Sequence, residues 1–114
     1  MLEIRSRDVG GITVLDLKGS LVAGLGLDAL AQRFKQLVSE QRVNMVLNLK
    51  DVSVIDSRGV GELVANFSSL KKNGGSLKLA CPGKFVREVL QITRIATIIE
   101  TYDTEEAALK AVAA

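Results

Sequence analysis

Short apolar runs alternate with segments of helical periodicity along this chain. Val43–Leu49 is an apolar run of the kind that forms a strand buried on both faces. Before and after it, in residues 27–38 and 57–70, apolar side chains recur at every third or fourth position, which predicts amphipathic helices. Strands and helices that alternate in this way pack as parallel strands joined by right-handed helical crossovers. The pattern therefore predicts an α/β domain.

The N-terminal segment predicts a hairpin before this alternation begins. A pair of glycines separates two strand-like runs, Leu2–Asp8 and Ile12–Leu17, and adjacent glycines suit a tight hairpin turn. Residues 18–20 then interrupt the strand pattern. We expect one domain, residues 1–114, in which an opening β-hairpin leads into alternating helices and strands on a mixed, mostly parallel sheet.

The C-terminal third continues the alternation. Ser76–Ala80 and the β-branched segment Ile95–Ile99 are predicted strands. Between them, Pro82 suits the first turn of a helix. Asp103, with Glu106 three residues later, predicts an acidic capping box that begins a last, alanine-rich helix. The inner face of the helix after Pro82 is expected to hold four apolar residues: Phe85, Val86, Val89 and Leu90.

Composition narrows the function before any motif is considered. The 114 residues contain no histidine and one cysteine, Cys81, so they lack the commonest general base and cannot build a cysteine metal site. Aromatic residues are only 4% and the net charge is +2, with Lys and Arg scattered, which disfavours nucleic-acid binding. No run approaches the roughly 20 apolar residues that cross a bilayer. We expect a soluble, cytoplasmic protein that is not an enzyme, uses no cofactor or metal, and neither binds nucleic acid directly nor inserts into a membrane.

Three shorter motifs have ordinary structural explanations. The loop of Gly24 and Gly26 loosely matches a dinucleotide-binding loop, but no strand leads straight into it and no acidic residue follows about 20 positions later. Ser68 and Lys71 have the spacing of penicillin-recognising enzymes without the other motifs of that class. Cys81 is expected to be a small buried hydrophobe, with a reactive thiol near a helix start as the other interpretation.

The helix that starts near Ser57 carries two glycines that a helix does not need. Gly59 and Gly61 each cost up to about 1 kcal/mol relative to alanine. Either their missing side chains let the helix start pack tightly, or they leave a flat surface on which a partner can approach Ser57. The serine fits two roles equally well, since it could cap the helix or accept a phosphate that the helix N-terminus would favour. Asp56 would then orient the hydroxyl or simply end the strand.

The stretch VLNLKDVSVIDSRGVGEL, followed by KKNGGSLKLA, resembles the STAS family, which is typified by bacterial anti-sigma-factor antagonists. The resemblance covers essentially the whole chain. It implies that Ser57, directly after Asp56, accepts a phosphate from a partner kinase that is also the anti-sigma factor. It further implies that Asn48 lines the site and that the segment of Ser20 and Val22, where the family often has Gly-Glu-Leu-Asp, lies near the partner.

Two positions depart from the family pattern. Arg58 stands where Ser or Thr usually follows the phosphorylated serine, and Val22 replaces an acidic residue. The resemblance implies an anti-sigma-factor antagonist that captures an anti-sigma kinase and releases a sigma factor until Ser57 is phosphorylated, with a cognate phosphatase as a further candidate partner. The residues expected to contact a partner are Asp56, Arg58, Gly59, Gly61, Asn48, Ser20 and Val22.

Two other functions stay open at this point. A STAS scaffold or transporter-associated subunit would bind its partner without a phosphorylation switch, and Arg58 and Val22 fit this as well as they fit a divergent kinase. A small enzyme or nucleotide binder would use Asp56 and Ser57, or the glycine loop that precedes the first helix. Ile55, however, stands where a nucleophile elbow needs glycine.

Overall fold

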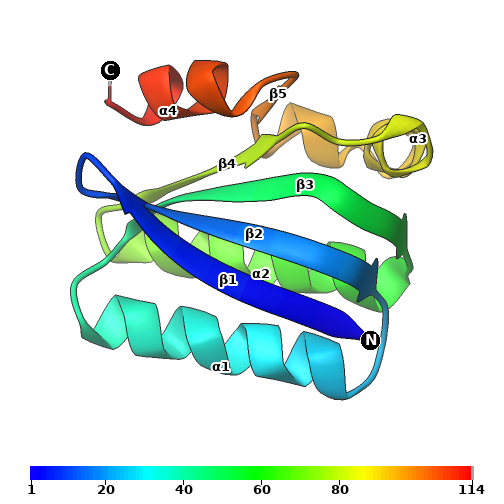
Figure 1. Cartoon of the computed structure of the whole chain (residues 1–114), viewed down its shortest axis with the longest axis horizontal. Coiled ribbons are helices and arrows are strands. Elements are labelled where there is room, and N and C mark those ends of the chain that lie inside the picture. The colour runs from blue at the N-terminus through cyan, green and yellow to red at the C-terminus, as the bar shows by residue number, and fades with distance from the viewer. Residues whose placement is uncertain (114) are drawn as a thin grey trace.

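A computed structural model describes residues 1–113 and arranges them as a sheet with helices on both faces (Figure 1). The strands lie in the order β1-β2-β3-β4-β5, with β1 and β2 antiparallel and every later pair parallel. The expected α/β class, with its opening hairpin and mixed, mostly parallel sheet, is confirmed. In chain order the elements are β1 (Leu2–Val9), β2 (Ile12–Leu21), α1 (Leu25–Ser39), β3 (Asn44–Ile55), α2 (Ser57–Lys72), β4 (Ser76–Ala80), α3 (Lys84–Ile92), the 3₁₀ helix η1 (Ile95–Thr97), β5 (Thr101–Tyr102) and α4 (Glu105–Ala113).

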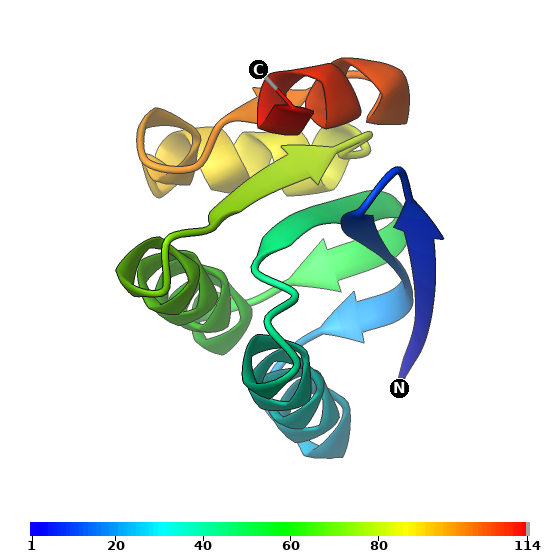
Figure 2. The same ribbon diagram turned by 90° about the vertical axis from the view of Figure 1, so that its left-hand side faces the viewer.

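The sheet separates two apolar clusters because side chains along a strand alternate between its faces. Leu15 and Leu47 belong to the larger cluster, which is completed by residues of α1, α2 and α3. Val14 and Val46 point the other way and pack with Ala108 of α4. Figures 1 and 2 show α1 and α2 side by side on one face of the sheet and α4 on the other.

The two central strands run further than their sequence patterns predict. Residues 18–20 do not end β2, which continues to Leu21, and β3 continues past Leu49 to Ile55. Asn48 therefore lies in the middle of β3, whereas the sequence placed it at the end of that strand. The C-terminal ends of both strands come to lie side by side, because Leu21 pairs with Ile55.

Two bulges in β3 account for this difference. Between the pairs Asp16–Asn48 and Lys18–Asp51, β2 advances by two residues while β3 advances by three. A second bulge lies between the pairs Gly19–Val52 and Ser20–Val54, where β2 advances by one residue and β3 by two. Each extra residue interrupts the alternation of buried and exposed side chains, so the core residues Leu49, Val52 and Ile55 are three positions apart. Bulges shift which face a side chain points to, so the periodicity of a single strand does not reveal that the strand continues.

The segment Ile95–Ile99 is not a strand, and the prediction there is wrong. Its first residues form η1, and the fifth strand is the short pair Thr101–Tyr102. Arg94 adopts a left-handed conformation with φ of 62°, which breaks the helical path after α3. Ile95 and Ile99 are both buried. The β-branched residues of this segment are thus buried in a tight turn and not in the extended strand that their composition predicted.

Helix α3 also differs from its prediction. It begins at Lys84, so Pro82 precedes the first turn and does not occupy it. Val86 and Leu90 are buried as expected, but the side chain of Phe85 is 51% exposed. A helix of this length can bury only a narrow stripe against the sheet, and Phe85 lies beside that stripe.

The cap of α4 lies one residue later than the predicted capping box. The hydroxyl of Thr104 accepts a hydrogen bond from the Ala107 N–H at 3.1 Å. Asp103 instead accepts a hydrogen bond from Arg87 of α3 at 2.7 Å. The expected last helix is present, but Asp103 does not cap it and instead connects its start to α3.

The first turn of α2 packs closely against the end of β2. The Asp56 N–H donates to the carbonyl oxygen of Leu21 at 3.2 Å. A Cβ atom on Gly59 would lie 2.1 Å from that same oxygen and 2.9 Å from Cγ1 of Ile55, whereas a Cβ atom on Gly61 would meet nothing within 4 Å. Tight packing therefore explains Gly59, and an open surface is left only at Gly61.

The two glycines should respond in opposite ways to alanine. Gly59→Ala should lower the free energy of unfolding by about 2 kcal/mol or more, because the backbone of β2 blocks the added carbon. Gly61→Ala should raise it by up to about 1 kcal/mol, because alanine is the better helix former and the site is open. Urea denaturation of both variants at neutral pH measures this. Equal effects of the two substitutions would contradict the packing described for Gly59.

Candidate functional site

Asp56 connects the start of α2 to the loop between β2 and α1. Its Oδ1 atom accepts a hydrogen bond from the Gly59 N–H at 2.8 Å, and its Oδ2 atom accepts one from the Ala23 N–H at 3.1 Å. Gly59 lies in the first turn of the helix and Ala23 in the loop. One carboxylate therefore holds together two segments that are 33 residues apart in the sequence.

The same hydrogen bonds keep Asp56 ionised. The N–H groups of Gly59 and then of Ala23 lower the pKa of the carboxyl below its ordinary value, and the backbone and charge of Arg58 act in the same direction. The partial positive charge of a helix N-terminus also favours a carboxylate at this position. The start of α2 thus carries a fixed negative charge beside Ser57.

The structure assigns the helix cap to Asp56 and leaves the Ser57 hydroxyl unused. Ser57 is the first residue of α2 and is exposed. Within residues 1–113 its hydroxyl forms no hydrogen bond, whereas the side chain of Asp56 accepts the capping bond. Of the two roles predicted for Ser57, capping is therefore performed by its neighbour.

The start of α2 and the segment that Asp56 binds carry further exposed residues. Arg58 and Gly61 are exposed on α2, and Val22 is half-buried in the adjoining loop. Leu25, the first residue of α1, is 88% exposed. Leu25 is not among the site residues predicted above; the signal that could have found it is a leucine outside the apolar stripe of its own helix, close to the loop that Asp56 binds. We call Ser57, Arg58, Gly61, Val22 and Leu25 the Ser57 surface.

Two other predicted contact residues do not lie openly on this surface. Gly59 is buried under the end of β2, so the expectation that it presents a flat face to a partner is wrong. Ser20 is half-buried in β2, and its N–H donates to the carbonyl oxygen of Met1 at 3.0 Å. Both residues shape the backbone beneath the Ser57 surface.

Asn48 belongs to a different part of the sheet. Its Nδ2 atom donates to Asp16 at 3.1 Å and to Glu105 at 3.4 Å, and Arg7 donates to the same two carboxylates. Asn48 precedes Ile55 by seven residues in β3, which corresponds to about 23 Å of extended strand. The structure therefore does not bring Asn48 together with Ser57.

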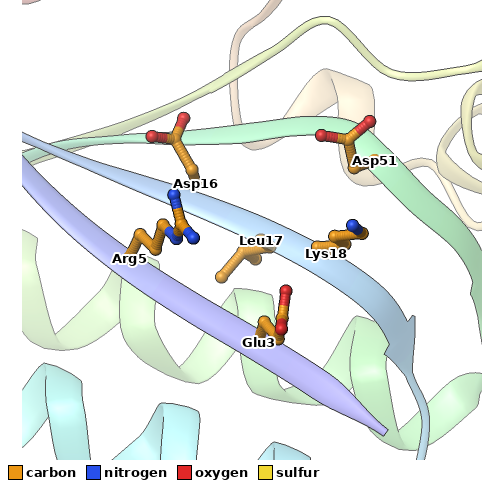
Figure 3. A pocket seen from close by; sticks show the side chains of 6 residues that line it. All are labelled: Glu3, Arg5, Asp16, Leu17, Lys18 and Asp51. Carbon is orange, nitrogen blue, oxygen red and sulfur yellow. The ribbon is translucent and has the colours of Figure 1, made fainter.

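A charged hollow of about 300 Å³ opens beyond α4, on the sheet face that α4 partly covers (Figure 3). The register places Arg5 opposite Asp16, and Lys18 between Glu3 and Asp51. Charges of opposite sign thus alternate across the strands, and they produce no field of a single sign that would attract a highly charged ligand. The lining residues, all labelled in Figure 3, are Glu3, Arg5, Asp16, Leu17, Lys18 and Asp51.

The glycine loop before α1 has a structural explanation. Gly24 has φ of 142°, a conformation that favours glycine, and it forms the N-terminal boundary of the helix. A Cβ atom on Gly26 would lie 2.8 Å from Cβ of Leu2, so the approach of β1 requires a small residue there. Asp28 in the first turn also places a negative charge where a phosphate would bind. Backbone conformation and packing therefore account for both glycines.

Residues 1–113 contain neither a helix suited to cross a bilayer nor a cluster of metal-binding side chains. None of their helices combines the length and the apolar character that a bilayer crossing requires. Cysteine, aspartate and glutamate side chains in this part of the chain do not gather into a group that could hold a metal ion.

The lowered pKa of Asp56 predicts how its contribution to stability depends on pH. The folded state holds this pKa below the value of about 3.9 that is typical of an unfolded aspartate. The stabilisation is therefore complete above that value and is lost as the pH falls through the lower, folded pKa. The wild type should unfold at higher urea than Asp56→Asn at neutral pH, and the gap should close in acid. A gap that stays constant down to about pH 2 would show that the charge contributes nothing.

Comparison with known proteins places this site in a family. The STAS domain model matches residues 3–108. The anti-sigma-B factor antagonist of Bacillus subtilis is 40% identical over 63 residues, which are 55% of this chain and 58% of that protein, less than two thirds of its length. A Thermotoga neapolitana protein is 36% identical over 87 residues, covering 72% of this chain and 77% of its own.

A solved structure shows the same fold over the whole chain. The crystal structure of an anti-sigma factor antagonist from Mycobacterium paratuberculosis superposes with a TM-score of 0.87 at 23% identity, covering 100% of this chain and 96% of that one. The family match extends across both the opening hairpin and the start of α2, where Asp56 and Ser57 lie. On this evidence the chain belongs to the STAS domain family.

Proposed function

We propose that this chain is an anti-sigma-factor antagonist whose binding is switched by phosphorylation of Ser57. The observation that carries the proposal is at the start of α2, where Asp56 caps the helix and the exposed Ser57 hydroxyl forms no hydrogen bond to any of residues 1–113. The name of the Bacillus subtilis relative supports the same role. In the cytoplasm, the unphosphorylated protein would bind an anti-sigma factor of the serine-kinase type, and a sigma factor would be released.

The phosphoryl transfer itself would need little from this chain beyond an accessible hydroxyl. The Ser57 oxygen would form a bond to the terminal phosphorus of a nucleoside triphosphate on the kinase, while the bond to the nucleoside diphosphate breaks. Both oxygens of Asp56 already accept backbone hydrogen bonds, so the hydroxyl proton would pass to a base of the kinase. A phosphatase would reverse the modification by hydrolysis.

A phosphate on Ser57 would change the charge of the surface while leaving the fold in place. Phosphoserine carries about −1.5 to −2 charges at pH 7, and a helix N-terminus tolerates such charge well. Asp56 is already ionised beside it, so two negative groups would adjoin on the Ser57 surface. A partner that accepts Arg58 with its own acidic groups would then be repelled.

The Ser57 surface also indicates the chemistry of the partner. Arg58 supplies a cation, and Leu25, which is 88% exposed, supplies an apolar contact. Gly61 adds no side chain, so a partner backbone can lie close to α2. We therefore expect the partner to present an acidic group beside an apolar depression.

A STAS scaffold without a phosphorylation switch is the second candidate function. It is favoured by two residues of the Ser57 surface, because Arg58 and Val22 replace the hydroxyl and acidic residues that the family pattern has there. Such a scaffold would use the same surface to bind a partner but would not respond to negative charge at Ser57. The next experiment separates the two candidates.

Substitutions at Ser57 test the switch directly. The wild-type protein serves as bait to recover the kinase, and calorimetry then compares the variants. Ser57→Ala should bind like the wild type, whereas Ser57→Asp should bind at least about tenfold more weakly. The free energy of unfolding of Ser57→Asp should stay within about 1 kcal/mol of the wild type, because a helix start favours a carboxylate. Equal binding by Ser57→Asp and Ser57→Ala would favour the scaffold without a switch.

Arg58 should contribute to binding of the unphosphorylated protein. Arg58→Ser should weaken binding about tenfold, on the order of 1.4 kcal/mol, without lowering stability. The loss should shrink at high salt, because the contact is partly exposed and is screened. Arg5→Ser is a matched control, since Arg5 is an exposed arginine on the sheet face away from the Ser57 surface. Unchanged binding by Arg58→Ser at low salt would make Arg58 an ordinary solvated residue.

A further inference from the structure

A groove of about 450 Å³ runs between α1 and α2, on a part of the molecule that the Ser57 surface does not include. Phe34 lines it and is only 3% exposed, and Val38 beside it is half-buried. Small residues from both helices, among them Ala31 and Ala65, let another helix approach closely. The residues that line this α1–α2 groove are Ala31, Phe34, Lys35, Val38, Ser39, Glu62, Ala65, Asn66 and Ser69.

Asn66 brings an unsatisfied amide to this groove. Its side chain is 7% exposed, and its Nδ2 atom has no hydrogen-bond partner within residues 1–113. Buried polar groups in folded proteins nearly always have a partner, so an unpaired one calls for an explanation. An amide carries both a donor and an acceptor. The Nδ2 atom is buried beneath the groove that Asn66 lines, so a rotation of the side chain on contact would bring it to an acceptor of a second molecule.

Charges of opposite sign border the groove. Lys35 stands on α1 and Glu62 on α2, and within residues 1–113 neither side chain forms an ion pair. The two helices lie side by side, as Figure 2 shows. The groove thus presents a cation along one border and an anion along the other.

We propose that the α1–α2 groove is the interface at which a second copy of this chain binds. A twofold axis along the groove would place α1 of each copy against α2 of the other. Lys35 of one copy then faces Glu62 of the other, and the symmetry repeats that pair. Once its side chain rotates toward the groove, each Asn66 amide can donate to the Asn66 oxygen of the second copy, as a single buried asparagine does in paired helices.

A second copy fits these features better than other occupants do. A small amphiphile could contact Phe34 and Asn66, but it would leave one of the two border charges without a partner. A helix of an unrelated protein would need an acid and a base at matching positions, which this chain already has in Lys35 and Glu62. The helices are about 22–24 Å long, so the contact is small. We therefore expect a dissociation constant between about 10 µM and 1 mM.

The experiment is sedimentation equilibrium of the whole chain over a concentration series that reaches about 1 mM. The wild type should dimerise. Lys35→Glu and Glu62→Lys should each raise the dissociation constant at least about tenfold, because each places like charges together twice in the dimer. The double variant should return it to within about threefold of the wild type, since the pairs are restored with exchanged signs.

The controls separate this interface from general effects of charge and from the proposed switch. Lys84→Glu and Glu88→Lys change exposed residues of α3 in the same way and should leave dimerisation unchanged. Ser57→Asp should also leave it unchanged, so a failure here and a failure of the proposed function are distinguishable. Circular dichroism confirms that each variant is folded. A wild type that stays monomeric at about 1 mM, or a double variant that does not recover, would overturn the proposal.

Discussion

The parallel pairing of β2 with β3 holds the rest of this structure in place. Leu15 and Leu47 pair at the centre of the sheet, are fully buried, and belong to the core that α1 and α2 cover. Extra residues in β3 let both strands continue until Leu21 lies beside Ile55. The loop after one strand and the helix after the other therefore start at the same edge of the sheet, where Asp56 can bind both.

This arrangement places residues that stabilise the fold next to exposed residues of the proposed binding surface. Asp56 and Gly59 serve the fold, since one binds two backbone N–H groups and the other makes room for the backbone of β2. The side chains of Ser57 and Arg58 are exposed on the same turn and form no hydrogen bond or ion pair within the described residues. The charge of this surface can therefore change while the start of α2 stays unaltered, which suits the proposed binding role.

Periodicity predicted the elements as far as β4 because the central strands and the helix stripes bury their side chains in regular patterns. It failed for Ile95–Ile99, since β-branched residues are buried in a tight turn as readily as in a strand. It placed Asn48 wrongly because a bulge is a relation between two strands and leaves no mark on one of them. The motif around Ser57 located the candidate site. It did not reveal the separate roles of Gly59 and Gly61, because only Gly59 packs against the end of β2, which is far from it in the sequence.

The cluster around Arg7 has a consequence for the order of folding. Its guanidinium binds Asp16 within the opening hairpin and Glu105 at the start of α4, 98 residues away. The hairpin pair is local and closes at little entropic cost, whereas the second contact must wait for nearly the whole chain. Helix α4 can therefore dock only after the opening hairpin has formed, and until it does so Val14 and Val46 lack the cover of Ala108. One apolar face of the sheet thus stays exposed in any folding intermediate in which α4 has not yet docked.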